Sequence, residues 1–319
     1  MVIVQSMTKL SCKHATALLF CVVCIIAYTL TSKTLKTNEQ IDPLSEFYQR
    51  HPIYKTRIDR LQNACKKTKN YSESHLSDSK RFLTYRYGEN WVACIQPKSG
   101  TTNWQKALIR AASNESSTHK NAVDSKNIYK VLPRLSDLNY KDRFEKITST
   151  RYKILVVRHP IQRLFSAWRD KFNKSSSDFW HTEKKYLSKI KLNKLVPDGM
   201  GCSFFDFIKY FLENKGIEKL NDHHWKSLEY QCDPCGVEYG IIALQESMDS
   251  DVGIILGEVF GGDNSSGFGV GQVSKMYNTH VSSDSRNFDL DENVLERLNS
   301  HFRRDYEMFG YSPLDRVGI

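Results

Sequence analysis

Two short stretches of the chain carry residues whose types and spacing suit the binding of anionic groups. The first spans residues 97–103, Pro-Lys-Ser-Gly-Thr-Thr-Asn, between an apolar run and a stretch of good helix formers. A loop in this place lies at a helix N-terminus, where unpaired backbone N–H groups and the helix dipole favour a phosphate or sulfate. Gly100 lets the backbone approach the anion, and Lys98 adds a mobile positive charge. The hydroxyls of Thr101 and Thr102 are further donors.

The second stretch begins with Arg158, which directly follows an apolar run at residues 152–157. Pro160 is tolerated in a first helical turn, and the apolar residues after it recur at helical spacing. Ser166 then lies about two turns into this helix. Because a planar guanidinium matches the oxygens of a phosphate, we expect Arg158 and Ser166 to converge on one phosphate group.

The elements that must position these residues are two strand–loop–helix units. Residues 91–95 and 152–157 are short apolar runs, typical of buried parallel strands, and residues 105–112 and 161–172 carry apolar side chains at helical spacing. Ligand sites of parallel sheets lie at the carboxyl ends of the strands, where both motifs stand. We therefore predict an α/β domain with a central, mainly parallel sheet flanked by helices.

The two stretches together resemble the donor-binding motifs of sulfotransferases that use 3′-phosphoadenosine 5′-phosphosulfate (PAPS). The resemblance implies a P-loop-like sulfotransferase fold, with the 5′-phosphosulfate at the first motif, the 3′-phosphate at the second, and no metal. The residues expected to bind PAPS are Pro97, Lys98, Ser99, Gly100, Thr101, Thr102, Asn103, Arg158, Arg163 and Ser166. A nucleotide kinase is disfavoured, because the first motif lacks the Gly-Lys-Ser/Thr spacing of a Walker loop.

A third stretch resembles one branch of the Golgi carbohydrate sulfotransferases, which includes the chondroitin and dermatan 4-O enzymes and the glucuronyl 3-O enzyme. It runs from His224-Trp225 through Cys232-Asp-Pro-Cys235 to a predicted strand at 237–244 and then Glu246. The resemblance implies transfer to a sugar hydroxyl, foremost O-4 of N-acetylgalactosamine in chondroitin or dermatan, with the glucuronyl 3-O type as the alternative. The chain departs from the branch at His159, where an acidic residue is usual, and at Leu244, where a lysine is frequent.

The chemistry of sulfuryl transfer assigns roles to individual residues. In-line displacement needs its developing charge neutralised and its nucleophile positioned, so we expect Lys98 to act on the sulfuryl oxygens. A sugar hydroxyl is a weak nucleophile, and histidine is the natural general base at neutral pH. Of the ten histidines, His224 is the expected base, with His223 and Glu246 as alternatives and a structural role for His224 left open.

The N-terminal region predicts a membrane anchor. Residues 15–30 are uncharged and mostly apolar, with lysines on both sides, and at about 1.5 Å per residue they span roughly 25 Å. We expect a cytosolic tail at 1–14, a transmembrane signal anchor at 15–32, a lumenal stem at 33–80 and a sulfotransferase domain at 81–319. A cleaved signal peptide is the alternative. Sequons for N-glycosylation follow the segment and favour a single-pass type II protein of the Golgi; they lie at Asn70, Asn114, Asn173 and Asn264.

Charge indicates an acidic partner. The chain has 319 residues and a net charge of +10, which suits a nucleic acid, an anionic membrane surface or an acidic polysaccharide. The motifs select the polysaccharide, with a glycosaminoglycan as acceptor and no nucleic acid. The basic run at 184–194, near Trp180 and Tyr186, is either an acceptor-binding surface or a solvated segment. Apolar residues recur at helical intervals within 43–67, so this part of the stem is expected to pack on the domain or to pair with a second copy in a homo-oligomer.

The cysteines predict structural disulfides. Five of the eight cysteines lie beyond the apolar segment and allow at most two disulfides, with a pairing that the sequence leaves open. These five are Cys65, Cys94, Cys202, Cys232 and Cys235. A zinc or redox site at Cys-Asp-Pro-Cys is disfavoured, because no second Cys-x-x-Cys accompanies it and the compartment is expected to be oxidising. A membrane-anchored glycan-binding protein without catalysis is the rival function, and the intact donor motifs weigh against it.

Overall fold

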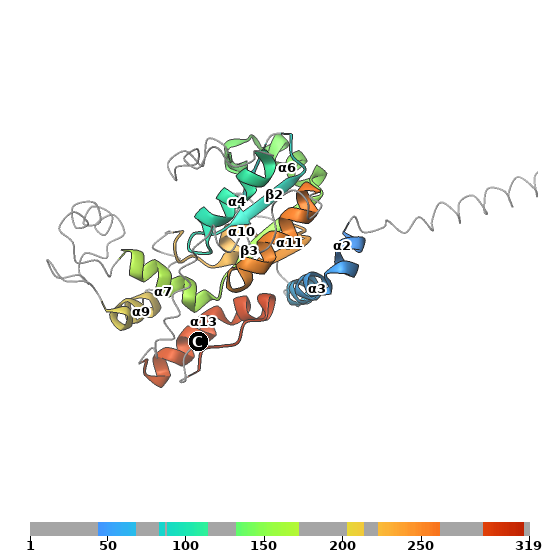
Figure 1. Ribbon diagram of the computed structural model, residues 1–319. Helices are drawn as coiled ribbons and strands as arrows, with labels where there is room; N and C mark the ends of the chain where they lie inside the picture. Colours follow the sequence, from blue (N-terminus) through green and yellow to red (C-terminus); the bar gives the residue numbers. More distant parts are fainter. Residues whose placement is uncertain are drawn as a thin grey trace, which may run out of the picture. The chain divides into compact units, whose positions relative to one another are not determined.

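The computed structural model describes residues 44–67, 83–86, 88–113, 132–171, 203–213, 223–261 and 290–315 (Figure 1). The expected membrane segment at 15–32, the four sequons, Cys202 and the basic run at 184–194 lie outside these ranges. Within the ranges, no helix combines the length and the apolar character needed to cross a bilayer.

A four-stranded sheet forms the centre of the fold, in the order β1-β2-β3-β4. Its strands are β1 (Leu83–Tyr85), β2 (Trp91–Ile95), β3 (Tyr152–Val157) and β4 (Ile241–Leu244). Strands β2, β3 and β4 are mutually parallel, and β1 pairs antiparallel with β2. The predicted mainly parallel sheet is confirmed. The expected strand at 237–244 is shorter than predicted, because residues 237–240 turn before the sheet, with the Tyr239 N–H donating to the Val237 carbonyl.

The register of the parallel strands brings their carboxyl ends together. Ile95 pairs with Val156, and Val157 pairs with Leu244. The chain therefore leaves β2, β3 and β4 at one edge of the sheet, and each of the two motifs that are predicted to bind the donor begins there. The predicted placement of both motifs at strand carboxyl ends is confirmed.

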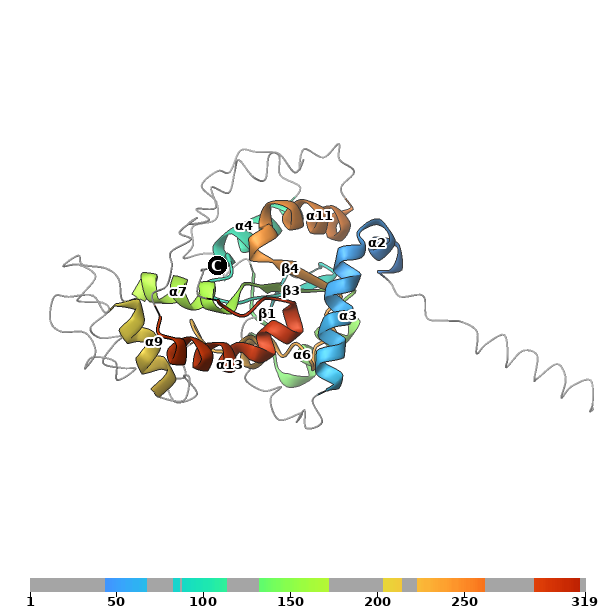
Figure 2. The same cartoon turned by 90° about the horizontal axis from the view of Figure 1, so that it is seen from below.

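Helices cover both faces of the sheet (Figure 2). On one face, α4 (Thr101–Ser113) packs against α11 (Met248–Phe260), a helix that the sequence analysis did not predict. The other face carries α3 (Pro52–Lys66) and α13 (Glu292–Phe309), which contact each other. Side chains alternate accordingly, and Val92, Leu155 and Ile242 share a core with residues of α3 and α13.

A second core lies beside the sheet and contains many aromatic side chains. It joins α7 (Pro160–Lys171), α9 (Phe204–Glu213) and α13, and it includes Trp225 of the His-Trp pair. The helix predicted at 161–172 is therefore confirmed as α7. The remaining elements are α2 (Ser45–Arg50), η3 (Leu135–Asp137), α6 (Tyr140–Ser149), α10 (Leu228–Cys232) and η4 (Gln245–Ser247).

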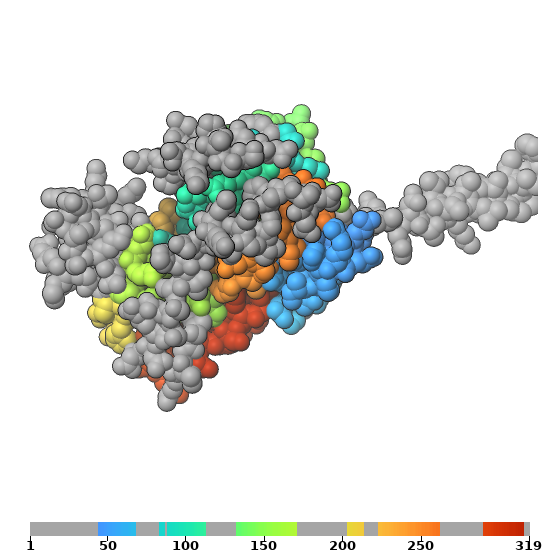
Figure 3. Space-filling model, in the orientation of Figure 1, coloured from blue at the N-terminus to red at the C-terminus, as the bar shows by residue number. Residues whose placement is uncertain are grey.

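Helix α3, expected in the stem, packs on the body of the protein. Its residues Tyr54, Ile58 and Leu61 are buried, and it belongs to the compact unit that runs from Phe47 to the C-terminus. Figure 3 shows its light blue surface against the orange surface of α11 and the red surface of α13. Of the two expectations for the apolar part of the stem, packing on the domain is the one observed.

Two disulfides join distant parts of the chain. Cys65 of α3 pairs with Cys235, and Cys94 of β2 pairs with Cys232 of α10. Both cysteines of the Cys-Asp-Pro-Cys segment are thus in structural disulfides, as expected, and neither is available as a zinc ligand. The two bonds tie α3 and β2 to the same short segment.

Loss of the Cys94–Cys232 disulfide should weaken the fold. The bond closes a sequence separation of 138 residues between two fully buried residues. We expect the Cys94→Ala/Cys232→Ala double variant to lose about 2–5 kcal/mol of unfolding free energy, because the unfolded chain regains the entropy of the open loop. Thermal unfolding of the variant measures this loss, with the Cys65→Ala/Cys235→Ala variant alongside. An unchanged melting temperature would contradict the expectation.

Candidate active site

The loop between β2 and α4 is tightly turned. The Ser99 N–H donates to the Gln96 carbonyl at 3.2 Å, and the Thr101 hydroxyl donates to the same carbonyl at 2.6 Å. Lys98 has a φ of 71°, a left-handed conformation that is uncommon for a residue with a side chain and is often found at functional sites. The proton of Thr101 is thus used inside the loop, whereas Thr102 is exposed. Thr101 therefore donates to the loop itself, and donation from the Thr102 hydroxyl to an anion stays a prediction.

Position 100 needs a glycine, because the residue that follows β4 lies too close for a side chain. Its φ is 72°, and a Cβ at this position would lie 1.9 Å from Oε1 of Gln245, the first residue after β4. The sequence predicted a close approach of ligand to Gly100, and the structure adds the Gln245 side chain as a neighbour. Sequence reasoning did not single out Gln245, although its place at the end of a predicted strand was a usable signal.

Lys98 forms an ion pair with the helix of the second motif. Its Nζ lies 2.6 Å from Oδ2 of Asp170, and the two side chains are 19% and 35% exposed. Asp170 is four residues after Ser166 on α7, so both side chains lie on one face of the helix. The ion pair with Asp170 therefore connects the loop of the first motif to the helix that carries Ser166. Its spacing from Ser166 was the signal that sequence reasoning did not use.

Arg158 joins the two motifs directly. Its Nη1 donates to the carbonyl oxygen of Lys98 at 2.9 Å. Burial lowers the pKa of the Arg158 guanidinium, and the charge of Glu246 opposes that shift. Arg158 Nε and the Ser99 hydroxyl are buried and have no hydrogen-bond partner among the described residues. Donors of this kind next to a lysine fit an anionic group, because a buried donor without a partner is costly.

Arg163, which the resemblance places among the donor-binding residues, donates hydrogen bonds to the backbone carbonyls of residues 224–226. Its side chain is buried, and its Nη1 donates to the His224 carbonyl at 3.0 Å, while Nη2 reaches the carbonyls of Trp225 at 3.5 Å and Lys226 at 2.6 Å. Burial lowers the pKa of Arg163 to about 10, and the charge of Asp305 opposes this shift. Helical spacing alone did not reveal that Arg163 faces this segment. We propose that Arg163 positions His224 and that Ser166, which is partly exposed, faces the donor.

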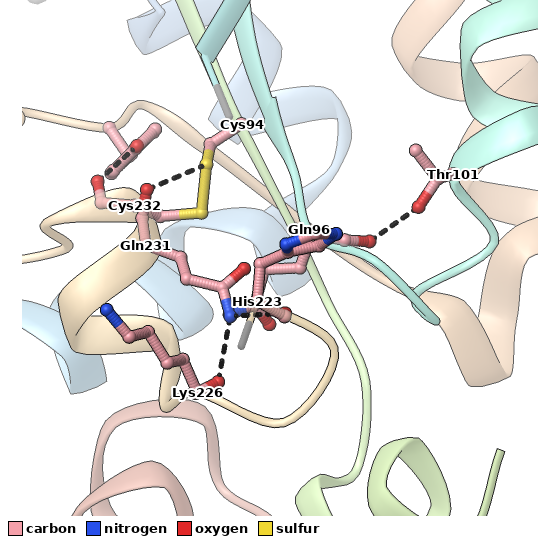
Figure 4. The surroundings of a disulfide bond; sticks show 8 residues. Cys94, Gln96, Thr101, His223, Lys226, Gln231 and Cys232 are labelled. Carbon is pink, nitrogen blue, oxygen red and sulfur yellow. Dashed lines mark hydrogen bonds between the residues drawn. A yellow bond between two sulfur atoms is a disulfide. The ribbon is translucent and has the colours of Figure 1, made fainter. Parts of the chain in front are cut away.

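Backbone contacts hold the two adjacent histidines. The rings of His223 and His224 lie 4.2 Å apart between centroids, and both residues are partly exposed. The Gln231 side chain donates to the carbonyls of His223 at 2.8 Å and Lys226 at 3.0 Å. Figure 4 shows this contact beside the disulfide that joins Cys232 to β2. The histidine segment is therefore anchored to the strand that leads into the first motif.

Glu246, the alternative base, has both carboxylate oxygens engaged. Oε1 accepts the His159 N–H at 2.7 Å, and Oε2 accepts the Tyr311 hydroxyl at 2.9 Å. The His159 ring lies 3.1 Å from the Ser312 carbonyl, and burial lowers the pKa of this histidine. His159, which stands where the branch usually has an acidic residue, thus connects the end of β3 with the C-terminal segment. These contacts favour a structural role for Glu246.

The comparisons with known proteins agree with this architecture. Residues 82–312 match the sulfotransferase family. The chain belongs to this family. It is a sulfotransferase-family enzyme, as the sequence motifs predicted. No solved structure gives a significant match to it.

Curated relatives of this sulfotransferase include carbohydrate sulfotransferases. Carbohydrate sulfotransferase 10 of Rattus norvegicus is 29% identical over 280 residues, which cover 83% of this chain and 77% of the relative. The protein of the same name from Homo sapiens is 26% identical over 302 residues, covering 89% and 81%. Carbohydrate sulfotransferase 8 of Homo sapiens is 29% identical over 209 residues, covering 61% and 47%.

Removal of the Lys98 ammonium should lower turnover. We expect Lys98→Ala to reduce kcat by about 10²-fold or more, because the transition state loses a positioned positive charge. Arg158→Ala should instead act mainly on the KM for the sulfuryl donor. Lys141→Ala, which removes an exposed lysine from α6, is the control and should keep wild-type rates. Near-normal kcat in the Lys98 variant would exclude a catalytic role for this lysine.

Proposed function

We propose that the enzyme transfers a sulfuryl group from PAPS to a hydroxyl of an acidic glycan. The observation that carries the proposal is the hydrogen bond from Arg158 to the Lys98 carbonyl, which joins the two motifs at one edge of the sheet. A donor with a phosphosulfate at one end and a 3′-phosphate at the other needs two adjacent anion sites. Membership of the sulfotransferase family supports the same donor.

The loop after β2 and helix α7 would bind opposite ends of the donor. PAPS supplies the activated sulfuryl group and a phosphate as leaving group. Lys98 and the loop at 99–103 would neutralise charge on the sulfuryl and phosphate oxygens, while Arg158 and Ser166 would bind the 3′-phosphate. Asp170 keeps Lys98 at the junction of the two motifs. A metal is not required, because these residues supply the positive charge.

His224 is the residue that we propose as general base for the sugar hydroxyl. Arg163, Gln231 and the Cys94–Cys232 disulfide hold its segment through backbone and covalent contacts. A general base must lie within hydrogen-bond reach of the hydroxyl that it deprotonates, so a fixed position of this segment supports the role. Of the two alternatives we prefer His223 to Glu246, because both carboxylate oxygens of Glu246 already accept hydrogen bonds.

Replacement of His224 should affect chemistry and not donor binding. A histidine base works only when its ring is neutral, so activity of the wild-type enzyme should fall on the acidic side of the rate profile. In His224→Ala we expect kcat to fall by about 10²-fold or more and the acidic limb to disappear. Binding of 3′-phosphoadenosine 5′-phosphate, measured by calorimetry, should stay unchanged. Full activity in this variant, with activity lost in His223→Ala, would move the role to His223.

A chain of acidic sugars is the acceptor class that we propose. The curated relatives are named as carbohydrate sulfotransferases, and the net charge of +10 favours an anionic acceptor. We propose O-4 of N-acetylgalactosamine in chondroitin or dermatan as the sulfated position, on the resemblance to the 4-O enzymes. The glucuronyl 3-O type is the second candidate, because the same motifs also resemble that enzyme.

The compartment that we propose is the Golgi lumen. Two disulfides between distant segments favour an oxidising compartment. We retain the single-pass type II topology, with a tail at 1–14, an anchor at 15–32 and a stem from residue 33. Because α3 belongs to the compact unit that begins at Phe47, we extend the catalytic body to include this helix.

Incubation of the enzyme with PAPS and a panel of desulfated glycans tests the proposed acceptor. We expect sulfation of chondroitin or desulfated dermatan, and a severalfold rise of the acceptor KM when salt increases from about 0.05 to 0.2 M, because salt screens a polyanion from basic residues. Charge reversal within 184–194 should have the same effect without changing PAPS affinity. Disaccharide analysis after lyase digestion identifies the position.

The same panel separates the other functions. Sulfate on glucuronic acid would support the 3-O type. Glycan binding without any transfer would support a non-catalytic glycan-binding protein. Equal activity on neutral glycans, with no dependence on salt, would overturn the proposed acceptor and leave the sulfotransferase activity in place.

A further inference from the structure

The two residues that directly follow β4, Gln245 and Glu246, together contact both motifs that are predicted to bind the donor. Oε1 of Gln245 lies against Gly100, at 1.9 Å from the position that a Cβ would take there, so this side chain is a wall of the first loop. The next residue, Glu246, accepts the N–H of His159, which directly follows Arg158. The segment of Gln245 and Glu246 is therefore in contact with the loop on one side and with the second motif on the other.

One carboxylate clamps this segment at both ends. Oδ2 of Asp251 accepts the backbone N–H of Leu244 at 2.8 Å and the hydroxyl of Ser247 at 2.9 Å. Leu244 directly precedes Gln245, and Ser247 directly follows Glu246. The position of Asp251 therefore decides where the two-residue segment sits relative to the sheet edge.

Helix α3 in turn holds Asp251. Arg57 Nη1 lies 2.8 Å from Oδ2 of Asp251 and also donates to the Ile242 carbonyl in β4 at 2.8 Å. The Tyr54 hydroxyl donates to Oδ1 of Asp251 at 2.8 Å. The Arg57 and Asp251 side chains are only 11% and 4% exposed. A buried pair of this kind has a defined geometry, and removal of one partner leaves the other charge uncompensated.

We propose that Arg57 and Asp251 are positioning residues of the donor site. Through Leu244 and Ser247 they fix the Gln245–Glu246 segment, and this segment sets the distance between the first loop and Arg158. Helix α3 is then part of the catalytic apparatus, although it contributes no group to the donor. The inference rests on the proposed use of PAPS. The competing explanation is that the ion pair only attaches α3 to the body.

The test uses the full-length protein and measures the Kd for 3′-phosphoadenosine 5′-phosphate together with kcat, both KM values and the melting temperature. In Arg57→Met we expect the Kd for this nucleotide and the KM for PAPS to rise about tenfold, the range seen for residues that act on a site through others. The KM for the acceptor should stay unchanged. A purely structural ion pair would lower the melting temperature and leave nucleotide binding of the folded protein intact.

Two control variants lie on the same helix. Lys55→Met removes the exposed ion pair with Asp59 and should change neither binding nor stability appreciably. Ile58→Ala removes packing from a buried position that makes no hydrogen bond to Asp251, so it should lower the melting temperature while the Kd stays within about twofold. The contrast between Ile58→Ala and Arg57→Met separates positioning from stability.

A double-mutant cycle tests the route of the effect. Gln245→Ala alone should raise the Kd, and its combination with Arg57→Met should raise it by much less than the product of the single effects, because both act on one contact. If Arg57→Met does not fold, Tyr54→Phe takes the place of Arg57→Met in the cycle. This variant removes one hydrogen-bond donor from Asp251. Wild-type nucleotide affinity in the folded Arg57 or Tyr54 variant, or independent effects in the cycle, would overturn the inference. Failure of the wild-type protein to bind the nucleotide would instead overturn the proposed donor.

Discussion

The parallel pairing of three strands is the constraint on which the rest of the structure depends. Because Ile95 pairs with Val156 and Val157 with Leu244, the chain leaves β2, β3 and β4 at one edge of the sheet. Polar groups that follow different strands meet at this edge: Arg158, after β3, donates to the Lys98 carbonyl, and Gln245, after β4, approaches Gly100 in the loop after β2. A slip of one strand would separate groups that work only together.

The polar groups at this edge are held mostly by contacts to backbone atoms. Arg163 donates to carbonyls of the histidine segment, Gln231 does the same from α10, and Asp251 accepts the Leu244 N–H. Such contacts fix where a segment lies without using its side chains. Side chains such as that of His224 can then vary in chemistry while the scaffold stays the same, which is a property of sites built on folds used for many reactions.

Helix α3 shows how a segment expected in the stem becomes part of the domain. It buries Tyr54, Ile58 and Leu61, forms a disulfide through Cys65, and places Arg57 in an ion pair that is mostly buried. Packing, a covalent bond and a charge pair act together, so that the helix has one position on the sheet. Arg57 is remote in sequence from the two loops that are predicted to bind the donor. Through Asp251 it is nevertheless connected to the Gln245–Glu246 segment, which contacts both.

The sequence by itself determined the two strand–loop–helix units, and it singled out Lys98 and Arg158 as the positive charges at their strand ends. Buried parallel strands are apolar on both faces, and loops that bind anions need glycine and positive charge, so both signals are local. Only the tertiary structure decided the partners: Asp170 for Lys98, Gln245 for Gly100, and the histidine segment for Arg163. It also decided the disulfide pairing, across 170 and 138 residues of sequence. These contacts join side chains that are remote along the chain, and no local periodicity records which distant residue will arrive beside which.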